Sequence, residues 1–159
     1  MNRIIAQYYP NFSQYQSLRD QMVDLLEDHD LNFRLSPALP SFGMLCREIG
    51  EIEHSYITSF SQLTQDFSWR NDDPEIERSV EKLSNWYADL DTRLREVIES
   101  MSDADLNDKK IDRGGGFILP PHIQLDVYKE ALLIFYGKAD IYLKAMGKEL
   151  PQRWAEWIG

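Results

Sequence analysis

The sequence predicts an all-α protein, a four-helix bundle with a long crossover before the last helix. Apolar residues recur every three or four positions in four segments, a spacing that places them on one face of a helix. Prolines and polar turns separate these segments. The third apolar stripe runs for eight positions without a break, and a stripe of that length needs a partner helix of similar length.

The first two helices are joined by the proline-containing residues 37–40. The first is expected to end near His29 and Asp30. The second is expected to begin after Ser41, whose hydroxyl can accept a hydrogen bond from the first turn, and to reach Phe67. The stripes are Tyr15, Leu18, Met22 and Leu25 in the first helix, and Phe42, Leu45, Ile49, Ile52, Tyr56, Phe60, Leu63 and Phe67 in the second.

The third helix is expected to run from Asp73 to Met101. Asp73 can cap it, and Pro74 suits the first helical position, where a backbone N–H would have no partner. At 1.5 Å per residue the helix would be about 42 Å long. Its stripe is Ile76, Val80, Leu83, Tyr87, Leu90, Leu94, Val97 and Met101.

The crossover, residues 102–121, contains three successive glycines that belong to no phosphate-binding motif, and is expected to be a flexible link. Gly147 is expected to end the last helix. The main stripe of that helix is Tyr128, Leu132, Phe135, Ala139, Tyr142 and Met146. Further apolar residues lie off this stripe, which predicts the most buried of the four helices: Val127, Leu133, Ile134 and Ile141. A short amphipathic tail with Trp154 and Trp157 follows Pro151.

Length and composition predict one domain over residues 1–159 and limit its partners. Lys and Arg number 17 against 27 Asp and Glu, a net charge of −10 that repels phosphate backbones, so no nucleic acid partner is expected. No run approaches the ~20 apolar residues that span a membrane, so no membrane partner is expected. The start of the sequence turns polar too early for a signal peptide, and a single Cys46 fits a reducing compartment, so a cytoplasmic location is expected.

Two stretches resemble motifs of DinB/YfiT-like proteins, the DinB superfamily. Residues 31–37 lead into SFGMLCREIGEIE at residues 41–53, which resembles the start of the family's second helix. YLKAMGKELP at residues 142–151 resembles the family's closing motif, YLR-x-x-G-x-x-x-P. Helix order and the long crossover agree over most of the chain. The resemblance implies a DinB/YfiT-like four-helix bundle, and because members are often dimeric, a homodimer is expected.

The resemblance also implies a metal site, which this sequence changes. Many members hold a divalent metal through three histidines, one on the second helix and two, four residues apart, on the last. These positions fall here at Glu48, Ala131 and Phe135. First-row metal sites need about three protein ligands, so we expect no metal cofactor. The leading hypothesis is a binding or structural module that has lost the site.

Two alternatives stay open, and with them the question whether the protein is an enzyme. One is a divalent-metal-dependent hydrolase or thiol transferase with an altered ligand set. Zn or Ni would then bind Glu48 and an acid of the last helix, from among Asp126, Glu130 and Asp140. The other alternative is a partner-binding protein that uses the C-terminal tail.

A small-molecule ligand is a further expectation, because several aromatic side chains could line a pocket. Aromatic residues at helical spacing more often form the core. The candidate lining residues are Glu48, Tyr56, Tyr128, Ala131, Phe135 and Tyr142.

The Glu-x-x-His motif and the single cysteine are both expected to be structural rather than catalytic. Glu51 and His54 form one Glu-x-x-His, but a di-metal bundle needs a second copy, which the sequence lacks. His54 also lies off the apolar stripe, which predicts a solvated histidine. Cys46 follows Leu45 on the buried side of the second helix, which predicts an inert core thiol.

Overall fold

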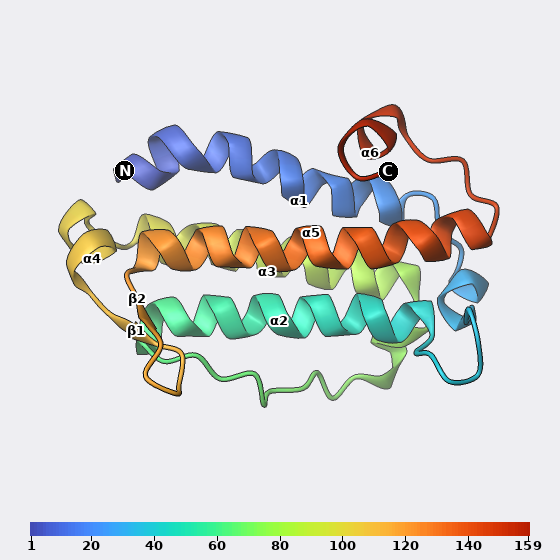
Figure 1. Ribbon diagram of the computed structural model, residues 1–159, viewed down its shortest axis with the longest axis horizontal. Helices are drawn as coiled ribbons and strands as arrows, with labels where there is room; N and C mark the ends of the chain where they lie inside the picture. Colours follow the sequence, from blue (N-terminus) through green and yellow to red (C-terminus); the bar gives the residue numbers. More distant parts are fainter.

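The computed structural model describes residues 1–159 and confirms a bundle of four long helices (Figure 1). The second long helix packs against the third and the last, and the first long helix contacts the same two. The four helices are α1 (Tyr9–Val23), α2 (Phe42–Gln62), α3 (Val80–Glu99) and α5 (Pro121–Ala145). In these terms α2 lies between α3 and α5, and α1 contacts both of them.

Shorter elements connect and extend these helices. Before α1 lies a π-helical turn, and two 3-10 turns precede α2 and α3; the crossover forms a short helix and a two-stranded antiparallel hairpin. The short elements are η1 (Ile4–Tyr8), η2 (Asp28–Asn32), η3 (Pro74–Glu77), α4 (Asp103–Asp108), β1 (Ile111–Asp112), β2 (Ile118–Leu119) and α6 (Gln152–Trp157).

One core of 33 buried apolar side chains runs through the bundle. The stripe of the third helix supplies its centre, where Leu83, Leu90 and Leu94 are completely buried. Burying a side chain of this size stabilises the fold by about 1.5–3 kcal/mol. The periodicity therefore identified the buried face of the third helix correctly.

The predicted ends of the second and third helices are wrong. α2 ends at Gln62, because Leu63 takes a left-handed conformation (φ 59°), and Phe67 lies beyond the helix. Asp73 does accept a hydrogen bond from a first-turn N–H, but it caps only the 3-10 turn η3. The chain then extends at Ser79, whose hydroxyl caps α3, so the predicted single helix is interrupted there.

The first helix begins earlier than its stripe, at Tyr9, and ends at Val23, so that His29 and Asp30 lie in η2. The crossover is an ordered hairpin rather than a plain link. Its three glycines, residues 114–116, all have positive φ, which glycine adopts at no steric cost, and they form the turn.

The last helix is not the most buried. Leu133, Ile134 and Ile141 are 37%, 62% and 57% exposed, because they lie away from the surfaces of α5 that contact α1, α2 and α4. More of α2 is buried, since it has a neighbour on both sides.

The C-terminal tail is part of the fold. α6 packs beside the end of α1 (Figure 1), where Trp154 is fully buried with its ring 5.1 Å from that of Tyr136. Half of the predicted partner-binding surface is therefore core. None of the helices combines the length and apolar character needed to cross a membrane.

Candidate functional site

A groove lies between α2 and α5 on the open side of the bundle. Its volume is about 160 Å³, and apolar side chains form most of its surface. Ala131 contributes to this space because its short side chain stands between larger neighbours. The lining residues of this α2–α5 groove are Leu45, Glu48, Ile49 and Ile52 of α2 and Ala131, Ile134, Phe135 and Lys138 of α5.

The structure divides the candidate pocket residues between the groove and the core. Glu48, Ala131 and Phe135 meet in the α2–α5 groove. The three tyrosines do not line it. Tyr56 and Tyr128 pack against each other in the core, with ring centroids 5.0 Å apart, and the buried Tyr142 donates a hydrogen bond to the Pro40 carbonyl oxygen at 2.8 Å.

A larger cleft of about 550 Å³ adjoins the groove and shares Glu48 and Ile52 with it. Two of its lining residues, Phe67 and Arg70, belong to residues 63–73, which we call the strap; this segment leaves the end of α2 and runs back beside the helix (Figure 1). The cleft is lined by Pro40, Met44, Arg47, Glu48, Glu51, Ile52, Phe67, Arg70 and Glu77.

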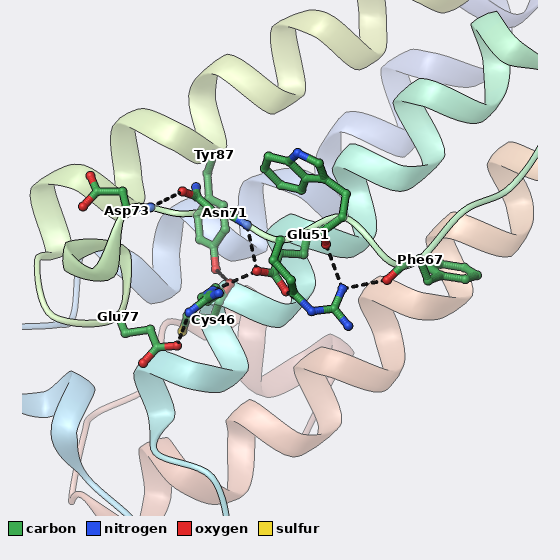
Figure 2. A network of polar contacts seen from close by, with 10 residues as sticks. Cys46, Glu51, Phe67, Asn71, Asp73, Glu77 and Tyr87 are labelled. Carbon is green, nitrogen blue, oxygen red and sulfur yellow. Dashed lines mark hydrogen bonds and ion pairs between the residues drawn. The ribbon is translucent and has the colours of Figure 1, made fainter.

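Glu51 ties the strap to α2 (Figure 2). Its carboxylate accepts a hydrogen bond from the Arg47 Nε at 2.8 Å and another from the Asn71 backbone N–H at 3.0 Å. Arg70 of the strap lies 3.6 Å from the second carboxylate oxygen, and Arg47 also donates to Glu77 at 2.8 Å. Both arginines of the cleft are thus engaged by carboxylates.

Aromatic stacking makes the second attachment of the strap. Trp69 lies flat on His54, with ring centroids 3.7 Å apart and planes 12° from parallel, and Trp86 of α3 lies 6.5 Å from Trp69. Trp86 in turn covers Gly50, where any Cβ would come within 2.5 Å of its ring. His54 is therefore half-buried and not solvated as predicted, and this burial, followed by the charge of Arg93, lowers its pKa.

Two charged side chains of the groove, unlike the arginines of the cleft, have no hydrogen-bond or ion-pair partner in the protein. Glu48 is exposed and lines both spaces, and its carboxylate has no hydrogen bond or ion pair with the protein. Lys138, on the α5 side of the groove, is also exposed and unpaired. These two side chains can form new polar contacts without breaking existing ones.

Two solved structures resemble this chain along nearly its whole length. A DinB-like protein from Bacillus cereus ATCC 10987 superposes with a TM-score of 0.74 at 19% identity, covering 90% of this chain and 93% of that one. The fold is DinB-like. A second DinB-like protein, YjoA from Bacillus subtilis, gives a TM-score of 0.70 at 13% identity, covering 94% of this chain and 96% of the other. No protein-family model and no curated protein sequence matches the chain.

The residues present do not fit the divalent metal that the DinB resemblance implies. At the three matched positions only Glu48 carries a donor atom, and nowhere in the chain do three His, Cys, Asp or Glu side chains converge. Two acids of the alternative ligand set face elsewhere: Asp126 accepts a hydrogen bond from Tyr8 at 2.5 Å, and Asp140 pairs with Lys144 at 2.8 Å. Glu130, the third, is exposed.

A buried charge cluster inside the DinB-like bundle escaped the sequence analysis. Arg19 of α1 and Glu53 of α2 are both completely buried and pair at 2.6 Å, and a second nitrogen of Arg19 lies 2.7 Å from Asp91 of α3. The guanidinium also lies 4.0 Å from the centre of the Tyr87 ring. Burial raises the pKa of Asp91 to about 7; Arg19 lowers this pKa, and the Glu53 carboxylate opposes Arg19.

Sequence spacing held a signal for this cluster. Glu53 lies four residues after Ile49 and three before Tyr56, and Arg19 lies three residues before Met22, so opposite charges occupy the apolar stripes of two helices. A charge at such a position needs a buried partner. None of the three clustered residues lines the groove or cleft, so their role is in the fold.

Cys46 is a buried thiol. Burial raises its pKa to about 12, so the nucleophilic thiolate does not form at neutral pH. Its backbone carbonyl accepts a hydrogen bond from the Tyr87 hydroxyl at 2.6 Å (Figure 2), which joins α2 to α3.

Proposed function

We propose that this DinB-like protein is a binding module that holds a small organic molecule in the α2–α5 groove and the adjoining cleft, without a metal. The supporting observation is the composition of the groove, in which carbon surfaces and one carboxylate stand at the positions matched to the family's three histidines. A cavity of about 150 Å³ with Leu, Ile and Phe walls is large enough to bind benzene, so the groove suits a ring-sized apolar group.

Binding can be tested with 2-phenylethanol, a neutral probe of that size. Titration into ¹⁵N-labelled protein is expected to shift the amide resonances of residues around Ile52 and Ala131. The variant Ala131→Phe fills the groove and should abolish these shifts, whereas Ala88→Phe, at an exposed position on α3, should leave them unchanged. Shifts that persist in Ala131→Phe would place the probe elsewhere and contradict the proposal.

Metal content separates this proposal from the alternative, a divalent-metal-dependent hydrolase or thiol transferase. Protein purified without a metal-binding tag is expected to contain far less than one equivalent of Zn, Ni, Fe or Mn per chain, because Glu48 is the one donor at the matched positions. Near one equivalent, lost in Glu48→Ala, would instead establish the altered ligand set.

A second candidate is self-association into a homodimer through α5. The exposed Leu133, Ile134 and Ile141 surround Gly137, beside which no atom lies within 4 Å of a Cβ position, so a second copy of the helix can approach closely. A two-fold contact of this kind buries the same patch on both copies. Ile134 also lines the groove, whereas Ile141 does not, so a substitution at Ile141 tests dimerisation without changing the groove lining.

Light scattering after size-exclusion chromatography measures the mass directly. We expect twice the chain mass for the unmodified protein and the chain mass for Ile141→Glu. Ile118→Glu, at an exposed position in the hairpin, is the matched control and should remain dimeric. A single-chain mass for the unmodified protein at 100 μM or more would exclude this candidate.

A further inference from the structure

We infer that the ligand of the α2–α5 groove is a small organic ammonium ion, with its apolar group in the groove and its positive charge beside Glu48. This inference rests on the proposed function, and it adds the sign of the ligand's charge and the side chain that receives it.

The charged side chains of the cleft leave one carboxylate free. Arg47 is engaged by both Glu51 and Glu77, and Arg70 lies against Glu51 and donates to the carbonyl oxygens of Phe67 and Trp69 at 2.6 and 2.7 Å. Glu48 has no such partner. With two arginines against three glutamates, the lining carries one negative charge in excess, and it resides on the unpaired side chain.

The position of Glu48 connects that charge to the apolar surface. Glu48 and Ile52 line both spaces, so a ligand whose ring occupies the groove places its adjacent atoms at the junction with the cleft. An ammonium group one or two carbons from the ring would reach the carboxylate and keep part of its hydration, because Glu48 is exposed. A charge-assisted hydrogen bond can form there at small desolvation cost.

Two other features favour a cation. Phe67 of the strap is 46% exposed on the wall of the cleft, and the face of an aromatic ring attracts ammonium ions. The net charge of −10 raises the local concentration of cations and lowers that of anions around the whole protein.

Lys138 is the residue that an anionic ligand would use. Lys138 lines the groove but not the cleft, whereas Glu48 lines both. A carboxylate beside Lys138 would be repelled by Glu48, the unpaired acid that lines the same groove. Glu48→Gln and Lys138→Gln therefore form a matched pair of variants, each removing one unpaired charge from the same groove.

The experiment uses three probes that share a phenyl group: 2-phenylethylamine, which is protonated at pH 7, 2-phenylethanol and phenylacetate. Their dissociation constants are measured by ¹⁵N chemical-shift titration at 20 mM and 300 mM NaCl. At low salt we expect the amine to bind about three- to fivefold more tightly than the alcohol and about tenfold more tightly than the carboxylate, as for an exposed ion pair. High salt should reduce both ratios.

The two variants show which side chain causes the preference for the amine. In Glu48→Gln the amine and the alcohol should bind equally, while in Lys138→Gln the preference for the amine should persist or grow. An equal or stronger affinity for phenylacetate, lost in Lys138→Gln, would overturn the cationic ligand and leave the binding module intact. Failure of all three probes to bind would overturn both the cationic ligand and the proposed binding module. Unchanged melting temperatures are expected for the two variants, because neither side chain has a protein partner.

Discussion

Glu51 and Glu53 lie two residues apart on α2, and both pair with arginines, yet they serve opposite sides of the helix. Glu53 faces the interior, where its partner Arg19 is fully buried; Glu51 faces the cleft, where its partner Arg47 is 26% exposed. A separation of two residues rotates a helical side chain by about 200°, which accounts for the division.

The difference lies in the access of water to each arginine. Removing one member of a buried ion pair leaves a charge without solvation and costs about 3–5 kcal/mol, whereas exposed pairs contribute about 0–1 kcal/mol. The same guanidinium–carboxylate chemistry therefore fixes the packing of three helices in one place and attaches the strap to α2 in the other.

Arg19→Met should give the largest effect, a loss of about 3–5 kcal/mol in the free energy of unfolding, because the completely buried Glu53 then has no cation beside it. Urea denaturation measures it. Arg47→Met is the matched change on the cleft side and should cost about 1 kcal/mol or less. Equal losses in the two variants would remove the distinction between the regions.

Leu90→Ala measures the contribution of an uncharged side chain in the core, for comparison with Arg19. Leu90 is completely buried in the middle of α3, so the change should cost about 2–5 kcal/mol through lost burial and the cavity left behind. Leu39→Ala, at a side chain 43% exposed, is the control and should change stability by less than about 0.5 kcal/mol. A loss below ~1 kcal/mol at Leu90 would contradict the helix register.

The buried cluster should also make stability depend on pH. The pKa of Asp91 is raised to about 7 in the folded protein, above its usual value of about 3.9, so the folded state retains a proton that the unfolded state loses between these values. This contribution is complete below pH 4 and is lost as pH rises through 7. Unfolding free energies between pH 5 and 8 should therefore fall less in Asp91→Asn than in the unmodified protein.

Asp89→Asn is the control for that measurement, since Asp89 is 60% exposed two residues away on α3. Its pH profile should follow that of the unmodified protein. A profile for Asp91→Asn that also follows it would show that another group carries the pH dependence.

Glu51→Gln should give the smallest change, about 1 kcal/mol, because the neutral amide keeps one acceptor and water reaches Arg47. The effect should be local: hydrogen exchange at the Asn71 amide should become faster, while exchange in the centre of α2 stays slow. Glu75→Gln, at an exposed position, is the control. Unchanged Asn71 exchange would mean that the stack of Trp69 on His54 is sufficient to hold the strap.

The apolar spacing in the sequence predicted which helix faces are buried, but it did not predict where the helices end or how the strap runs. Leu90 and its stripe could be placed because burial of one helix face imposes a regular spacing. The break at Ser79 could not, since Asp73 and Pro74 are an equally good start for either a 3-10 turn or an α-helix. Phe67 continued the apolar spacing of α2, but the helix ends at the left-handed Leu63, and the residues that follow pair with β1.

Three of the candidate pocket residues lie together in the structure. Glu48, Ala131 and Phe135 were placed together by the family resemblance, and the structure brings them into one groove. The cleft was missed because the strap, which supplies part of its lining, has no periodicity and is held by backbone contacts such as the Asn71 N–H to Glu51. Contacts of that kind leave no pattern in side-chain type.

The close approach of Trp86 to Gly50 has an experimental use. With Trp69 of the strap beside it, the two indoles form an intrinsic fluorescent reporter on one side of α2. Opening of the strap would transfer Trp69 from its histidine neighbour into water and shift its emission to longer wavelength. The emission of these two indoles, superposed on that of Trp154 and Trp157, would report such an opening in dilute solution without any attached dye.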